Sequence, residues 1–419
     1  MTGILTRIVR RLGRLVEPLI DPDAADRRRR EEALTKQIEA VGGSLSRLAG
    51  QVERLTQRVD KIDRRQIDHL DSAVAALRLS TKRQATLAER VAREAHRGQE
   101  HEFTRERVLR RLHHVARRGT PLLVGPWTGE VGFELLYWAP FVRWAIHRFG
   151  VDPATVTLLS RGRTASWYGL DGARYIDVFD LRSPAEFREQ TAAVRKQRRL
   201  RLFDRALLRE VARSMEQRPG IVHPAMMYAL FMPYWKQQQS RRWVEDFSEF
   251  ARITPPAVPG LQLPRDYVAV RFYFSDCFPD TAANRALIDD MVRSLSAETH
   301  VVVLGSGTRV DDHHDFSAAA SERVHTVDHL MTPANNLAVQ TAVLAGARAF
   351  VGTYGGFSYL APLCGVNTVA LYSRRTFFVY HMDFAQAMFD AVGGGSLTVV
   401  DATVTPLMRA LAARGVESK

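Results

Sequence analysis

The sequence is poor in cysteine and contains no long apolar run. Cys277 and Cys364 are its two cysteines, and they lie far apart in 419 residues. Such isolated thiols exclude a disulfide framework and a cysteine-rich metal site, and they indicate a reducing compartment such as the cytoplasm. No stretch approaches the roughly 18 apolar residues of a membrane span, and the N-terminus lacks the features of a secretory signal. Export and membrane insertion are therefore not expected.

Basic residues outnumber acidic ones in the first part of the chain. Residues 1–118 hold 27 Lys and Arg against 17 Asp and Glu, so ten of the thirteen net positive charges lie there. Because this charge belongs to an N-terminal appendage, it does not predict nucleic-acid binding by the globular part. The length of the chain and its apolar content of 46% instead predict two globular domains with appendages.

Residues 1–20 have the pattern of a basic amphipathic helix. Apolar residues recur at helical spacing, and arginines occupy the rest of the helical wheel. Such a helix can lie in the headgroup layer of an anionic membrane, which would place the protein at the inner face of the cell membrane. The alternative is a helix that docks on the protein's own core or on a partner. Residues 21–33, with four consecutive arginines, are expected to form a solvated linker.

Residues 34–117 are predicted to form a coiled coil. Apolar residues alternate at steps of four and three without a miss, at positions 34, 38, 41, 45, 48, 52, 55, 59 and 62. Branched residues at heptad position a and leucines at d favour a parallel homodimer. A four-residue insertion after Ile62 would unwind the supercoil locally. A single helix packed along the protein's own body is the alternative.

Residues 118–419 read as alternating strands and helices. This pattern predicts α/β architecture with two Rossmann-like domains that face a cleft, residues 118–255 and residues 256–419. The boundary is the proline-rich segment at 254–260. Open parallel sheets bind ligands beyond the carboxyl ends of their strands, so the site is expected there. A last helix near 404–414 is expected to cross back onto the first domain.

The stretch GPWTGEVGFELLYW, residues 125–138, joins a strand to a helix through a glycine-rich turn. Glu130 lies in this turn beside Gly129, where a helix dipole keeps a carboxylate ionised and glycine lets a substrate approach, as a general base requires. The alternative is helix capping, which Glu134 could serve equally well. Gly129 and Glu134 are also candidates for contacts with the substrate. The glycine spacing differs from the dinucleotide fingerprint, so a nicotinamide cofactor is not supported.

Two features of the second domain suit a phosphate group. Arg271 falls where a buried strand ends, and its guanidinium could bind phosphate oxygens or pair with Asp276 or Asp280. Thr353, Tyr354, Gly355 and Gly356 form a turn between a strand and a helix, where free backbone N–H groups can bind phosphate. The glycines could also serve the backbone angles alone.

Two further segments are candidates for substrate contacts. DDHHD, residues 311–315, concentrates possible metal ligands, but adjacent residues in a loop cannot all face one ion. We expect no metal there, and we expect Asp312 or His313 to contact the base or ribose of a nucleotide. His223 opens an aromatic segment that could form an acceptor platform or pack between the domains.

These motifs resemble those of nucleotide-sugar glycosyltransferases of the GT-B fold. RFYF, which contains Arg271, is similar to the arginine strand of the fucosyltransferase-like branch, and GTYGGFSYLAP looks like its late phosphate turn. The resemblance covers about residues 119–415. It implies that Arg271 and residues 353–356 hold the donor diphosphate, that Glu130 is the base, and that neither a metal nor another cofactor is needed. A glycan or a lipid-linked acceptor would take the sugar, as in surface polysaccharide synthesis.

Two other functions stay open at this point. A polysaccharide pyruvyl transferase would use basic residues to bind a carboxylate donor. A coiled-coil scaffold without catalytic activity would bind nucleotide without turnover, or would not bind it.

Overall fold

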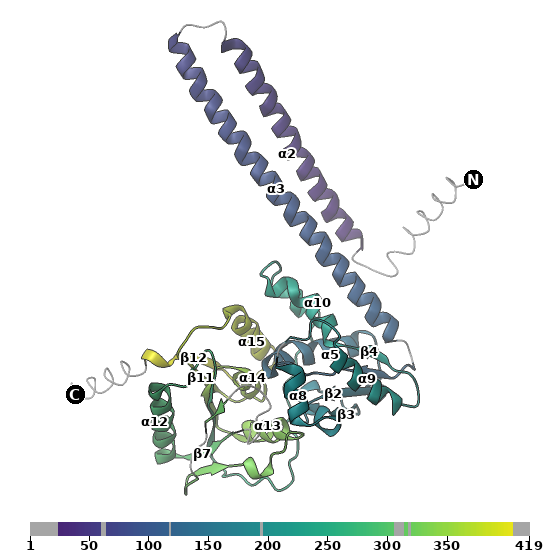
Figure 1. The fold of residues 1–419 in the computed structure, drawn as a ribbon, viewed down its shortest axis with the longest axis vertical. Coiled ribbons are helices and arrows are strands. Elements are labelled where there is room, and N and C mark those ends of the chain that lie inside the picture. Colours follow the sequence, from purple (N-terminus) through teal and green to yellow (C-terminus); the bar gives the residue numbers. More distant parts are fainter. Residues whose placement is uncertain are drawn as a thin grey trace, which may run out of the picture. The chain divides into compact units, whose positions relative to one another are not determined.

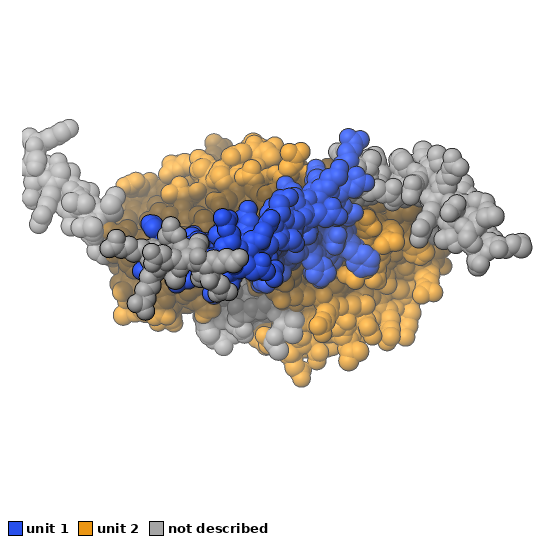
Figure 2. All heavy atoms as spheres, turned by 90° about the horizontal axis from the view of Figure 1, so that it is seen from above, with its two compact units in different colours: residues 1–104 blue, residues 105–419 orange. Residues whose placement is uncertain are grey.

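The computed structural model describes residues 24–59, 64–116, 119–192, 196–305, 314–316 and 320–404. The chain divides into two compact units, residues 1–104 and residues 105–419, which Figure 2 draws in blue and orange. The predicted amphipathic helix at 1–20, Asp312, His313 and residues 405–414 of the predicted last helix lie outside the described residues. No helix within the described ranges is long and apolar enough to cross a bilayer.

The first unit is built from α2 (Ala24–Val59) and most of α3 (Arg64–Val115). Most described heptad positions of α2 are half-buried, whereas Ile38 is exposed. Thr56 of α2 lines one shallow hollow together with Val74 and Arg78 of α3, so the two helices are neighbours within one chain (Figure 1). The helical character of the described residues between 34 and 115 is confirmed, and α2 packs beside α3 of the same chain. The linker predicted at 21–33 is wrong for residues 24–33, because these residues form the start of α2. The coiled coil stays a prediction. Pairing of two chains into a parallel dimer stays a prediction.

The last turns of α3 belong to the second unit. Val108 and Leu112 are buried in the same core cluster as β1 (Leu122–Val124). The guanidinium of Arg105 lies 5.4 Å from the ring centroid of Phe247. The globular part therefore begins at Arg105, because the end of α3 supplies apolar side chains to the core. The boundary after residue 117, predicted from the onset of alternating strands and helices, is too late.

The first half of the second unit contains a four-stranded parallel sheet in the order β3-β2-β1-β4. Every residue of β1 and β2 is buried, as expected for strands that helices cover on both faces. The other strands are β2 (Val156–Ser160), β3 (Arg174–Asp177) and β4 (Gly220–Val222). The helices are α4 (Val131–Phe133), the π-helix η1 (Glu134–Trp138), α5 (Ala139–Arg148), α6 (Ala165–Tyr168), α7 (Val178–Leu181), α8 (Pro184–Thr191), α9 (Leu202–Arg213), α10 (Pro224–Trp235) and α11 (Arg242–Glu245), with the 3-10 turn η2 (Pro153–Thr155).

The second half contains a six-stranded parallel sheet in the order β12-β11-β10-β5-β7-β9. Its strands are β5 (Tyr267–Arg271), β7 (His300–Val303), β9 (Val324–Thr326), β10 (Ala349–Thr353), β11 (Thr368–Tyr372) and β12 (Leu397–Asp401). A short antiparallel pair, β6 (Tyr273–Phe274) and β8 (His314–Asp315), follows the end of β5. The helices are α12 (Ala282–Glu298), α13 (Asn336–Gly346), α14 (Gly356–Leu363) and α15 (Val379–Val392), with the 3-10 turns η3 (Asp328–Leu330) and η4 (Ala402–Val404). The predicted α/β architecture with two parallel sheets is confirmed.

A continuous apolar core joins the two halves. One buried cluster contains residues of both sheets and of the helices between them. The ring of Tyr137 in η1 stacks on Phe384 of α15 at a centroid distance of 5.0 Å. In Figure 1, α14 and α15 accordingly lie beside the first half. Within the described residues, α15 (Val379–Val392) is thus a late helix that packs on the first half.

Candidate functional site

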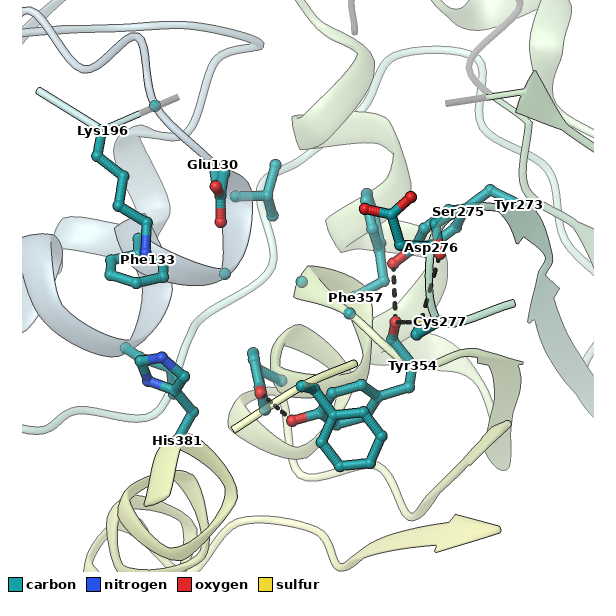
Figure 3. A pocket seen from close by; sticks show the side chains of 18 of the residues that line it. Glu130, Phe133, Lys196, Tyr273, Ser275, Asp276, Cys277, Tyr354, Phe357 and His381 are labelled. Atoms are coloured by element: carbon teal, nitrogen blue, oxygen red, sulfur yellow. Dashed lines mark hydrogen bonds between the residues drawn. The ribbon is translucent and has the colours of Figure 1, made fainter. Parts of the chain in front are cut away.

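A cavity of about 420 Å³, here called the cleft, opens at the carboxyl ends of both parallel sheets. The first half contributes the turn after β1 and Arg161, which directly follows β2. The second half contributes Arg271 at the end of β5 and the turn after β10. Figure 3 shows Glu130, Phe133 and Lys196 on one side of the cleft and Tyr273, Asp276 and Phe357 on the other. This is the edge at which open parallel sheets bind ligands.

The turn that carries Glu130 is held by buried polar side chains. The backbone N–H of Thr128 donates to Gln197 Oε1 at 2.9 Å, and Gln197 Nε2 donates to the carbonyl of Pro126 at 2.8 Å. Arg201 donates to the Thr128 hydroxyl at 2.8 Å. Glu130 itself is exposed at the start of α4, and among the described residues its side chain makes no capping hydrogen bond. The capping alternative is therefore wrong for Glu130, and its carboxylate points into the cleft (Figure 3).

The surroundings of Glu130 are basic and aromatic. Lys196 Nζ lies 4.3 Å from the ring centroid of Phe133. Burial lowers the pKa of Lys196, while the neighbouring carboxylate of Glu130 acts in the opposite direction. Burial also lowers the pKa of His381 to about 3, and the charge of Lys196 adds to this effect. His381 thus contributes a neutral ring to the lining of the cleft, and its Nδ1 lies 2.6 Å from the Tyr137 hydroxyl.

Glu134 is placed differently from the sequence prediction. It is fully buried and is not among the described residues that line the cleft. Its Oε1 accepts hydrogen bonds from Ser160 at 2.6 Å, Tyr168 at 2.7 Å and Thr164 at 3.1 Å, whereas Oε2 has no partner among the described residues. Burial raises the pKa of Glu134 to about 7, although these hydrogen bonds oppose the shift. Glu134 therefore contacts the core of the first half and not a ligand in the cleft.

Arg271 lines the cleft at the end of β5 and is 8% exposed. It donates to Gln340 Oε1 at 2.5 Å and pairs with Asp315 at 3.3 Å, and not with Asp276 or Asp280 as the alternative required. Its guanidinium carbon lies 3.9 Å from the ring centroid of Phe357, while Nε has no hydrogen-bond partner in the described part of the chain. A nearly buried guanidinium, fixed by Gln340 and Asp315, thus lies beside the cleft.

The paired glycines serve close packing as well as the cleft. A Cβ on Gly355 would overlap the Tyr273 hydroxyl, and one on Gly356 would lie 2.8 Å from Val131 Cγ1 and 2.9 Å from the backbone nitrogen of Gly132. The glycine turns of the two halves therefore touch each other, which no larger residue at Gly356 would permit. Gly355 and Gly356 are half-buried and still line the cleft at the start of α14.

The remaining predicted residues divide into two groups. Gly129 and Tyr354 line the cleft. Thr353 and His223 are buried and are not among the described lining residues. The Thr353 hydroxyl accepts from the backbone of Tyr273 at 3.1 Å, and His223 caps α10 by accepting from the backbone of Ala225 at 3.1 Å. These two side chains therefore hold the backbone near the site.

Sequence reasoning missed several cleft residues, among them four that carry basic groups: Arg161, Arg188, Lys196 and His381. Arg161 follows the apolar strand VTLLS just as Arg271 ends the strand YVAVR, so the same signal could have found it. Lys196 and His381 lie in segments without a strand or glycine signal, and only the fold brings them to the cleft. Across the described ranges, no group of three or more His, Cys, Asp or Glu side chains is placed to hold a metal ion.

No protein-family model and no curated protein sequence matches the chain. Among solved structures, the iron-containing dodecameric glycosyltransferase TibC of enterotoxigenic E. coli H10407 is 9% identical over 61% of this chain and 58% of its own, with a TM-score of 0.34. The E. coli ADP-heptose LPS heptosyltransferase II is 11% identical over 67% of this chain and 90% of its own, with a TM-score of 0.35.

A third similar structure is Thermosulfurimonas dismutans KpsC, a beta Kdo 2,4 transferase. It is 10% identical over 28% of this chain and 37% of its own, with a TM-score of 0.21. The chain thus spans less than two thirds of the length of TibC and of KpsC. All three proteins are named as transferases, and the fucosyltransferase-like branch stays a prediction for this chain.

Proposed function

We propose that the protein is a glycosyltransferase that moves a sugar from a nucleoside-diphosphate donor to a hydroxyl group of a glycan or lipid-linked acceptor. The observation that carries the proposal is the composition of the cleft. A carboxylate on the first half, Glu130, and a guanidinium on the second half, Arg271, line one cavity at the carboxyl ends of both sheets. A base that accepts the proton of the acceptor hydroxyl and a cation that stabilises the leaving diphosphate would both accelerate sugar transfer.

The donor diphosphate would bind on the second half. Arg271 supplies a buried guanidinium whose Nε lacks a partner among the described residues, and α14 begins at Gly356 beside it. A charge-assisted hydrogen bond from arginine and the positive end of a helix both stabilise phosphate oxygens. These groups would also stabilise the negative charge that develops as the diphosphate leaves, so the proposed reaction requires no metal.

Glu130 would act on the acceptor. Its carboxylate takes the proton from the acceptor hydroxyl, and the acceptor oxygen forms a bond to the anomeric carbon of the donor sugar. The bond between that carbon and the diphosphate oxygen breaks, and the nucleoside diphosphate leaves with the electron pair.

Two variants separate binding from chemistry. Nucleoside diphosphates, nucleotide sugars and phosphoenolpyruvate are titrated into the wild type, Arg271→Gln and Glu130→Gln, with binding followed by calorimetry and transfer by donor hydrolysis. We expect Arg271→Gln to weaken nucleotide binding by roughly tenfold or more, since a hydrogen bond to a charged group is lost. Glu130→Gln should retain binding and lose about 10²-fold or more of the hydrolysis rate.

Exposed residues of the same types provide matched controls. Arg293→Gln and Glu216→Gln change residues outside the described lining of the cleft, and both should behave as the wild type. Turnover of phosphoenolpyruvate in place of a nucleotide sugar would replace the proposal with pyruvyl transfer. Nucleotide binding without turnover of any donor would replace the proposal with the function of a scaffold that has no catalytic activity.

A further inference from the structure

We propose that the first half of the cleft binds a negatively charged group of the acceptor through a set of three cations, Arg161, Arg188 and Lys196, here called the anion site. The group is a carboxylate of an acidic sugar or a phosphate, since guanidinium and ammonium groups bind both. The inference rests on the proposed function, because it takes Glu130 as the residue that faces the acceptor hydroxyl.

Arg161 is the centre of the anion site. It directly follows β2, lines the cleft and is 6% exposed. One of its terminal nitrogens donates to the carbonyl of Gly129 at 3.0 Å, and its guanidinium carbon lies 5.8 Å from the ring centroid of Phe187. Nε has no hydrogen-bond partner in the part of the chain that the structure describes. A guanidinium this deeply buried is costly to maintain unless an anion balances its charge.

The charges around Arg161 are not balanced within the described residues. The first half lines the cleft with Arg161, Arg188 and Lys196 against one carboxylate, Glu130. The buried carboxyl of Glu134 interacts electrostatically with Arg161, but burial raises the pKa of Glu134 to about 7, so it is only partly ionised near neutral pH. The net positive charge of this side of the cleft favours an anion over a neutral group.

The position of Arg161 assigns the anion to the acceptor and not to the donor. Arg161 bonds to Gly129, the residue directly before Glu130, so its guanidinium lies beside the turn that carries the proposed base. The donor diphosphate is assigned to Arg271 and to α14, which belong to the other sheet. An anion at Arg161 would therefore hold the acceptor hydroxyl near Glu130. This would make acidic acceptors better substrates than neutral ones.

Small probes test the anion site without knowledge of the full acceptor. Methyl β-glucuronide, glucose 1-phosphate and the neutral methyl β-glucoside are titrated into the full-length protein, the variant Arg161→Gln and the control Arg209→Gln, whose exposed residue lies on α9. We expect at least one anionic probe to bind roughly tenfold or more tightly than the neutral glycoside, and we expect Arg161→Gln to remove this preference. The stronger anionic probe identifies carboxylate or phosphate as the natural group.

The neutral probe separates binding from a merely structural effect. If Arg161 only supports the Gly129 turn, Arg161→Gln will change all three probes and nucleotide binding alike, and the anion site is refuted. Equal affinity of the wild type for charged and neutral probes also refutes it. A loss of nucleoside diphosphate affinity with unchanged probe affinity assigns Arg161 to the donor and overturns the inference. Because nucleotide binding is measured separately, failure of the donor assignment alone leaves an Arg161-dependent preference for anions visible.

Discussion

Replacement of Glu134 by glutamine tests the electrostatics beneath the cleft. Glu134 Oε1 accepts three hydrogen bonds from Ser160, Thr164 and Tyr168, and Oε2 has no partner among the described residues. Glutamine can present its carbonyl oxygen to the same three donors and places its amide where Oε2 lies. It therefore imitates the protonated carboxyl group in shape and in hydrogen bonding, and it cannot ionise.

The expected magnitude follows from the pKa of Glu134. Burial raises this pKa from its ordinary value of 4.5 to about 7. Between these values the folded protein retains the proton and the unfolded chain releases it, so the free energy of unfolding decreases as the pH rises. The whole shift corresponds to about 3 kcal/mol at roughly 1.4 kcal/mol per pKa unit. Glu134→Gln lacks this loss, so its stability relative to the wild type should increase by about 2 to 3 kcal/mol from pH 5 to pH 8.

Urea denaturation followed by tryptophan fluorescence measures this difference. All six tryptophans lie between residues 127 and 243, so the signal reports on the first half, which contains Glu134. Asp177, whose pKa burial raises to about 6, is present in both proteins and cancels in the comparison. Parallel stability curves for the two proteins over this pH range would refute the reasoning, because they would show that Glu134 is ionised equally in the folded and unfolded states.

Two further changes test the packing. Gly356→Ala should destabilise the protein by roughly 1 to 3 kcal/mol in thermal unfolding, because its Cβ would press on the backbone of Gly132. Gly98→Ala, where a Cβ meets nothing within 4 Å, is the control, and equal stability of the two variants would contradict the contact. A chain that begins at Arg105 retains Val108 and Leu112 in its core and should stay folded but lose the predicted dimer. Light scattering checks this, and an unchanged oligomeric state would place dimerisation outside residues 1–104.

The alternation of short apolar strands and helices was sufficient to predict two parallel sheets. Runs such as YVAVR are buried at every residue. A strand that is covered on both faces needs a continuous apolar run, whichever side chains pack against it. The boundary at the N-terminal side was less predictable. Val108 and Leu112 occupy helical positions that continue the pattern of the preceding residues, so the sequence does not reveal that these two side chains pack on a sheet and not on another helix.

For the site, the rule that ligands bind at the carboxyl ends of parallel strands predicted residues whose place in the cleft follows from the path of the backbone. Glu130 and Arg271 follow or end buried strands, and both line the cleft. Glu134 is four residues after Glu130, yet it enters the core because η1 turns its side chain toward Ser160 and Tyr168. The rotation of a short helix relative to its sheet depends on tertiary packing, and no local pattern in the sequence specifies it.

The glycine pair illustrates why one motif can have two physical causes. A glycine after a strand permits a phosphate to approach the backbone, and it equally permits another backbone to approach. At Gly356 the second cause is demonstrated by the contact with Gly132, whereas the first rests on the proposed function. The two causes are compatible, because one side of the turn touches Gly132 while another side lines the cleft. The contact then sets the separation between the halves, and with it the width of the cavity in which Glu130 and Arg271 would act on one substrate pair.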